Sequence, residues 1–199
     1  MPGSRLLDVG CGAGAFAEAA QPSYQEVRGI DISSEAVLLA RQRGVDAHEA
    51  DIGTGRLPFG DGTFDTVVAL SVLQYVVDLP GALAECRRVL RPGGQCILCV
   101  PNMRTAWRVS TLLLKGRFPR TSCDPVGVDG GTVHYFTSKT IRDLVVRAGF
   151  EVAGVFGVFC IPQWLETQFD SGVTGWFKRE LCCAETLLNL RAASTRAAT

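Results

Sequence analysis

Two kinds of apolar pattern alternate along most of this chain, and this alternation is the feature that most limits its fold. Short apolar runs of strand length are followed by segments in which apolar residues recur every three or four positions. Such alternation is typical of β-α-β units, in which helices connect parallel strands. We therefore expect an α/β fold with a doubly wound, mainly parallel sheet and helices on both of its faces.

The expected strands and helices have recognisable bounds. The strands are Arg5 to Val9, Val27 to Ile32, Asp46 to Ala50, Thr66 to Leu70, Gln95 to Val100 and Val152 to Phe159. The helices are Glu35 to Arg43, Leu83 to Leu90 and Lys139 to Ala148. Ser33 or Ser34 is expected to cap the first of these helices, and Thr137 or Ser138 the last.

Two regions interrupt the alternation. Arg104 to Thr132 is a long insertion with a helical first half, Trp107 to Leu114, and we expect it to form a lid over an acceptor pocket. After Phe159 no convincing seventh strand is found, and a helix is expected from about Trp176 to Arg191, before a disordered tail. The expected organisation is therefore a ligand-binding domain over residues 1–160 and a helical extension over residues 161–199.

Charge and composition exclude several classes of partner. Lys and Arg number 20, as do Asp and Glu, so the formal net charge is zero and no nucleic-acid partner is expected. No apolar run is long enough to span a bilayer, and the first residues do not resemble a secretion signal. A hydrophobic fraction of 47% builds a core without disulfides, so we expect reduced cysteines and a cytoplasmic protein.

A glycine-rich turn, Gly10-Cys11-Gly12-Ala13-Gly14, joins the first expected strand to a helix. Glycine permits positive φ and lets a ligand touch the backbone, while the start of a helix presents free N–H groups. The next strand ends near Asp31, whose carboxylate suits a bidentate contact with the two hydroxyls of a ribose. These features fit both NAD and S-adenosylmethionine.

Asp8 favours the second of these ligands. It lies in the first strand, two residues before Gly10, where its charge would crowd a pyrophosphate. A carboxylate at this place suits a cation, and S-adenosylmethionine carries a sulfonium and an ammonium group.

The segment Leu6-Leu7-Asp8-Val9-Gly10-Cys11-Gly12-Ala13-Gly14 resembles the first motif of the class I S-adenosylmethionine-dependent methyltransferases. Further segments similar to that family follow in its order: Asp31, Asp51-Ile52, Phe64 to Tyr75, Leu90 to Gly94, His134 to Thr137 and Ala148 to Phe150. The resemblance covers roughly residues 5 to 159. It implies a Rossmann-like fold and S-adenosylmethionine as the cofactor.

The resemblance also implies which residues hold the cofactor. Asp31 matches the ribose-binding acid, and Asp51 with Ile52 matches the residues that hold adenine, although a solvated turn acid remains an alternative for Asp51. The expected cofactor-binding residues are Asp8, Gly10, Cys11, Gly12, Gly14, Asp31, Ile32, Asp51, Ile52, Leu70 and Ser71.

Two side chains are candidates for a catalytic role. Methyl transfer from a sulfonium needs proximity, orientation and sometimes a base. His134 is expected to accept the proton of a hydroxyl acceptor, and the alternative is that it only fixes its own loop. Tyr75 is expected to contact the methionine part of the cofactor or the acceptor, and plain packing is its alternative.

The family resemblance implies methyl transfer to a hydroxyl, amine, carboxylate or carbon of a small molecule. The chain lacks an Asn- or Asp-Pro-Pro-Tyr segment and a Pro-Cys pair, which argues against nucleobase and protein-amide acceptors. Two alternatives remain open. One is a catalytically silent, cofactor-binding partner subunit, which missing terminal elements would fit, and the other is a nicotinamide-dependent oxidoreductase.

Overall fold

Seven strands form a single sheet in the computed structural model, which describes residues 4–116, 131–158 and 185–192. The strands are β1 (Arg5–Val9), β2 (Glu26–Asp31), β3 (Asp46–Glu49), β4 (Phe64–Leu70), β5 (Leu90–Pro101), β6 (Phe150–Val158) and β7 (Glu185–Ala192). Their order across the sheet is β3-β2-β1-β4-β5-β7-β6. Neighbours from β3 to β5 are parallel, whereas β7 runs antiparallel to β5 and β6. The predicted mainly parallel, doubly wound sheet is thus confirmed.

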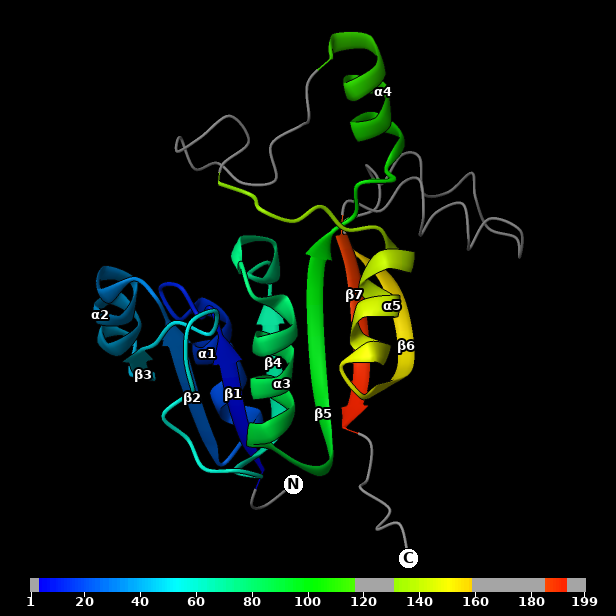
Figure 1. Cartoon of the computed structure of the whole chain (residues 1–199). Helices are drawn as coiled ribbons and strands as arrows, with labels where there is room; N and C mark the ends of the chain where they lie inside the picture. Colours follow the sequence, from blue (N-terminus) through cyan, green and yellow to red (C-terminus); the bar gives the residue numbers. More distant parts are fainter. Residues whose placement is uncertain (1–3, 117–130, 159–184, 193–199) are drawn as a thin grey trace, which may run out of the picture.

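Helices cover both faces of this sheet (Figure 1). One face packs against α1 (Ala15–Ala20) and α2 (Ser34–Gln42), and the other against α3 (Leu79–Val89) and α5 (Ser138–Arg147). Two 3-10 helices, η1 (Gln21–Ser23) and η2 (Leu73–Tyr75), follow α1 and β4. The helix α4 (Ala106–Lys115) confirms the helical first half of the predicted insertion, and it stands beyond the carboxyl end of β5 (Figure 1).

The predicted helix caps are present in the structure. Ser33 accepts a hydrogen bond from the N–H of Ala36, and Thr137 forms a capping box with Thr140. The helix α3 begins four residues earlier than predicted. Asp78 caps it through the N–H of Gly81, and proline is favourable in a first helical turn because its missing N–H needs no partner there.

The C-terminal end of the described chain corrects the sequence prediction. Residues up to Arg191 were expected to be helical, and no seventh strand was expected, but Glu185–Ala192 forms β7 between β5 and β6. Thr186, Leu188, Leu190 and Ala192 are buried and alternate with more exposed residues, which is the period of a strand. Burial in the sheet overrides the helix propensity of Leu, Glu and Arg.

The correction also affects the predicted domain boundary, because β7 joins the same sheet as the first 160 residues. The remainder of the predicted extension, and the second half of the insertion, lie outside the described residues. Cys11, Cys86, Cys96 and Cys99 are buried free thiols. Within the described ranges, no helix is long and apolar enough to cross a membrane.

The connections reverse direction between β1 and β4. From β1 the chain winds outward through β2 and β3, and it then returns to the other side of β1 as β4. In open α/β sheets, ligands bind at such a switch point, outside the carboxyl ends of the strands. This place is where the candidate residues of the glycine turn and Asp31 meet.

Candidate cofactor site

A cavity of about 260 Å³ lies at the switch point, against the ends of β1, β2 and β3 and against η2 and its flanking residues. Its lining includes six of the site residues predicted from the sequence, namely Gly10, Asp31, Ile32, Asp51, Ile52 and Tyr75. Asp8, Cys11, Gly12, Gly14, Leu70, Ser71 and His134 do not line it. Sequence reasoning did not nominate Gly53, Thr54, Val72, Val76 or Val77, which do line it. Small and apolar loop residues carry no chemical signature that would identify them in advance.

The glycine turn needs its glycines for different reasons. Gly10, Gly12 and Gly14 all have positive φ, the region that side chains other than glycine disfavour. A Cβ at Gly10 would lie 2.6 Å from Cγ2 of Val72, so the turn packs directly on the segment between β4 and η2. A Cβ at Gly12 would meet nothing within 4 Å. Gly10 is therefore restricted by packing as well as by conformation.

Asp31 is held by two backbone donors. Its Oδ2 accepts the N–H of Gly12 at 2.8 Å, and its Oδ1 accepts the N–H of Ser33 at 2.9 Å. A carboxylate oxygen has two lone pairs, so each oxygen keeps one for a further donor. Because Asp31 also lines the cavity, this arrangement fits the two hydroxyls of a ribose.

Asp51 is held by its own turn. Its Oδ1 accepts the N–H of Gly53 at 2.7 Å, and its Oδ2 accepts the hydroxyl of Thr54 at 2.8 Å. A Cβ at Gly53 would lie 3.3 Å from Cγ1 of Val76, so this turn packs closely against the segment after η2. These contacts suit both the adenine role and the turn role that the sequence left open for Asp51.

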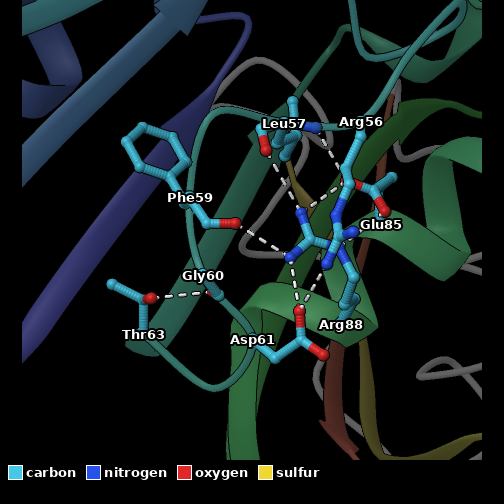
Figure 2. A network of polar contacts seen from close by, with 8 residues as sticks. All are labelled: Arg56, Leu57, Phe59, Gly60, Asp61, Thr63, Glu85 and Arg88. Atoms are coloured by element: carbon cyan, nitrogen blue, oxygen red, sulfur yellow. Dashed lines mark hydrogen bonds and ion pairs between the residues drawn. The ribbon is translucent and has the colours of Figure 1, made fainter.

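Two residues of α3 hold the loop that continues from Asp51 toward β4 (Figure 2). The guanidinium of Arg88 donates to the carbonyls of Leu57 and Phe59 at 3.2 and 2.8 Å. It also donates to both carboxylate oxygens of Glu85, each at 2.7 Å, and to Asp61 at 2.7 Å. One arginine thus joins the helix to three points of the loop.

Glu85 completes this network by accepting the N–H of Leu57 at 2.8 Å. The hydrogen bond from Arg88 is the main cause that lowers the pKa of Glu85, so its carboxylate stays charged at neutral pH. The side chains of Arg88 and Glu85 are 16% and 18% exposed. This pair could not be recognised from the sequence, because an Arg three residues after a Glu is common on any solvent-facing helix.

Asp8 is almost fully buried in β1, and its Oδ2 has no hydrogen-bond partner. Burial, followed by the charge of Asp31, raises the pKa of Asp8 to about 7. A nearby cation would favour the charged carboxylate and lower this pKa. Burial, with smaller contributions from Asp8 and Asp31, raises the pKa of Cys11 to about 12, so that thiol stays protonated.

The two predicted catalytic residues, Tyr75 and His134, lie in η2 and beside it. Tyr75 is its last residue and lines the cavity. The backbone N–H groups of Val133 and His134 both donate to the carbonyl of Gln74, which fixes their segment against η2. Nε2 of His134 lies 3.4 Å from the carbonyl of Val77, a residue of the cavity wall. His134 is therefore beside the cavity and also bound to its own surroundings, as both of its expected roles require.

Comparisons with known proteins agree with this geometry. A family model described as "Methyltransferase domain" matches residues 7–98. The ubiquinone/menaquinone biosynthesis C-methyltransferase of Desulfotalea psychrophila is 30% identical over 166 residues, which cover 75% of this chain and 67% of that protein. The malonyl-[acyl-carrier protein] O-methyltransferase of Serratia marcescens is 38% identical over 93 residues, which cover 47% of this chain and 36% of that enzyme.

A solved structure supports the fold independently. An S-adenosylmethionine-dependent methyltransferase from Thermotoga maritima has a TM-score of 0.68 and 22% identity, over 96% of this chain and 84% of that one. The chain spans less than half the length of several curated relatives that it matches. The match to the Desulfotalea enzyme nevertheless covers three quarters of this chain and two thirds of that enzyme. The chain therefore belongs to the class I S-adenosylmethionine-dependent methyltransferases.

Proposed function

We propose that this protein transfers a methyl group from S-adenosylmethionine to a small-molecule acceptor. The observation that carries the proposal is the Asp31 carboxylate, which two backbone N–H groups orient at a switch-point cavity. When bound, S-adenosylmethionine supplies a methyl group on a positively charged sulfur, which is a good leaving group. The protein then has to hold and orient the reactants.

Each end of the cavity has residues suited to one part of the cofactor. Asp31 would bind the ribose hydroxyls, and the turn of Asp51 would hold the adenine against the apolar side chains of Val76 and Val77. Asp8 would balance the positive charge from below the glycine turn, since its carboxylate has an unpaired oxygen. Gly10, Cys11, Gly12, Gly14, Ile32, Ile52, Leu70 and Ser71 complete the proposed set.

The acceptor is proposed to be a small molecule that reacts through a hydroxyl, amine, carboxylate or carbon. Curated relatives with this family's sequence include methyltransferases named for ubiquinone and for malonyl-acyl-carrier protein. His134 stays our candidate for the base that a hydroxyl acceptor needs, and Tyr75 stays a candidate for contact with the methionine part or the acceptor. The lid role of residues 104–132 also stays a prediction.

Two further points complete the proposal. A cytoplasmic location stays part of the proposal, as expected from the composition of the chain. The presence of β7 weakens the alternative of a silent partner subunit, since the expected absence of a seventh strand was part of its basis.

Incubation with S-adenosylmethionine labelled in its methyl group and a fractionated cell extract tests the function. We expect label in a small molecule of one or a few fractions, and much less with the Asp31→Ala variant. If the protein binds the cofactor but labels no fraction beyond the level of Asp31→Ala, the proposed activity is wrong.

A further inference from the structure

A second group of polar side chains lies at the carboxyl edge of the sheet, beside the cofactor cavity. Glu185, the first residue of β7, pairs with Pro101 of β5. Its side chain reaches across β5 to the end of β4, where the hydroxyl of Ser71 donates to Oε1 at 3.3 Å. The thiol of Cys99 donates to Oε2 at 2.8 Å. Three strands therefore bring one carboxylate and two hydrogen-bond donors together.

This group lies toward the glycine turn rather than toward the adenine turn. Ser71 directly precedes Val72, which lines the cavity and packs on Gly10. The turn of Asp51 and Gly53 packs instead on Val76, farther along the same segment. A ligand with adenine at Asp51 and ribose at Asp31 therefore extends its remaining part toward Val72, and so toward Ser71 and Glu185.

Two hydrogen-bond donors and one positively charged side chain lie around Glu185. Burial, and then the hydrogen bond to Glu185, raise the pKa of the Cys99 thiol well above its usual range, so the thiol stays protonated and donates. The buried guanidinium of Arg108 donates to the carbonyl of Asn102 at 2.8 Å. Burial lowers the pKa of Arg108, and the negative charge of Glu185 raises it. The positive charge of Arg108 therefore lies near the Glu185 carboxylate.

We propose that Glu185 binds the reacting group of the acceptor through a hydrogen bond from its hydroxyl or amine. This assignment rests on the proposed function and narrows it to acceptors whose nucleophilic atom carries a proton. For a hydroxyl, oxygen supplies the electron pair of the new bond to carbon, and the pair of the carbon–sulfur bond stays on sulfur. The hydroxyl proton passes to Glu185, which then takes the place of His134 as the base, and from Glu185 to water, so charge and atoms balance.

Sinefungin tests this assignment without knowledge of the acceptor. In this analogue an amine-bearing carbon replaces the methyl-bearing sulfur, so its ammonium group points where the methyl group meets the acceptor. Titration calorimetry would compare sinefungin with S-adenosylhomocysteine, which lacks that group. We expect Glu185→Gln to weaken sinefungin about tenfold, the usual scale for a charge-assisted hydrogen bond, and to leave S-adenosylhomocysteine unchanged.

Three further variants sharpen the test. Glu185→Asp keeps the charge and should give an intermediate loss. Glu151→Gln, an exposed glutamate of β6 at the opposite edge of the sheet, should leave both affinities unchanged. His134→Ala should not alter the ratio of the two affinities if Glu185 is the group that faces the methyl position.

The possible outcomes separate the two proposals. An unchanged sinefungin affinity in Glu185→Gln, or an equal loss for both ligands, would overturn the role of Glu185 while the proposed function stands. If the unaltered protein binds neither ligand, the proposed function fails, and the assignment of Glu185 fails with it.

Discussion

The proposed adenosine side and the proposed acceptor side of the site are assembled in different ways. On the adenosine side, Asp31 and Asp51 receive hydrogen bonds mostly from residues two or three positions away, and the glycine turn adds the N–H of Gly12. On the acceptor side, Glu185 meets Ser71 and Cys99 across 114 and 86 residues. Local turns are encoded within a few residues, whereas the acceptor side exists only after β4, β5 and β7 are paired. We therefore expect the turns of Asp31 and Asp51 to be the more rigid part of the site, and the group around Glu185 to be the more variable part.

The largest effect is expected within the glycine turn. Gly10→Ala adds a Cβ that collides with Val72 at a positive φ, and should destabilise the protein by about 2–4 kcal/mol. Gly12→Ala has the same type of backbone strain but free space, and should cost about 1 kcal/mol. Urea unfolding of the ligand-free variants measures both values. Equal losses of stability in the two variants would show that the contact between residue 10 and Val72 is unimportant.

A smaller effect is expected from the network that holds the adenine-side loop. Arg88→Met removes the hydrogen bonds to Leu57, Phe59 and Glu85, and should destabilise the protein by about 1.5 kcal/mol. Its affinity for S-adenosylhomocysteine should fall as well, because the loop continues from the turn of Asp51. The matched control is Arg91→Met, whose side chain is 60% exposed and pairs with Asp65. A similar loss in both variants would contradict a special role for Arg88.

The most gradual effect is expected from pH. The folded-state pKa of Asp8 is raised from 3.8 to about 7, so the folded protein holds this proton more tightly than the unfolded chain does. The contribution of Asp8 to the free energy of unfolding is therefore most favourable below pH 4. It is lost as the pH rises toward 7, by at most about 1.4 kcal/mol for each pH unit.

Thermal unfolding of the ligand-free protein between pH 5 and 8 measures this dependence. Asp8→Asn should flatten it and raise the melting temperature most at pH 8. A cation near Asp8 lowers its pKa, so S-adenosylmethionine should bind with release of protons near pH 7. Identical pH profiles for the variant and the unaltered protein would contradict the buried, ionisable state of Asp8.

Sequence patterns predicted several residues that the fold brings together at the cavity, because these residues stand near successive strand ends. Asp31 and the glycine turn stand at strand ends that periodicity locates. The C-terminal strand escaped prediction because its residues favour helix locally, and only pairing with β5 and β6 makes the extended form stable. Glu185 was not predicted as a site residue for the same reason, since nothing in a single sequence places residue 185 beside residue 71. The loop contacts of Arg88 were likewise invisible, because they involve backbone carbonyls.

The use of S-adenosylmethionine as cofactor is tested most directly by the affinity of the protein for S-adenosylhomocysteine and for NADH, measured by titration calorimetry. We expect the protein to bind the first and not the second. In Asp31→Ala the affinity for S-adenosylhomocysteine should fall by about 1.5–3 kcal/mol, because charge-assisted hydrogen bonds to the ribose are lost. Asp143→Asn, an exposed acid of α5, should leave it unchanged. Tighter binding of NADH, or an unchanged affinity in a folded Asp31→Ala variant, would contradict the account.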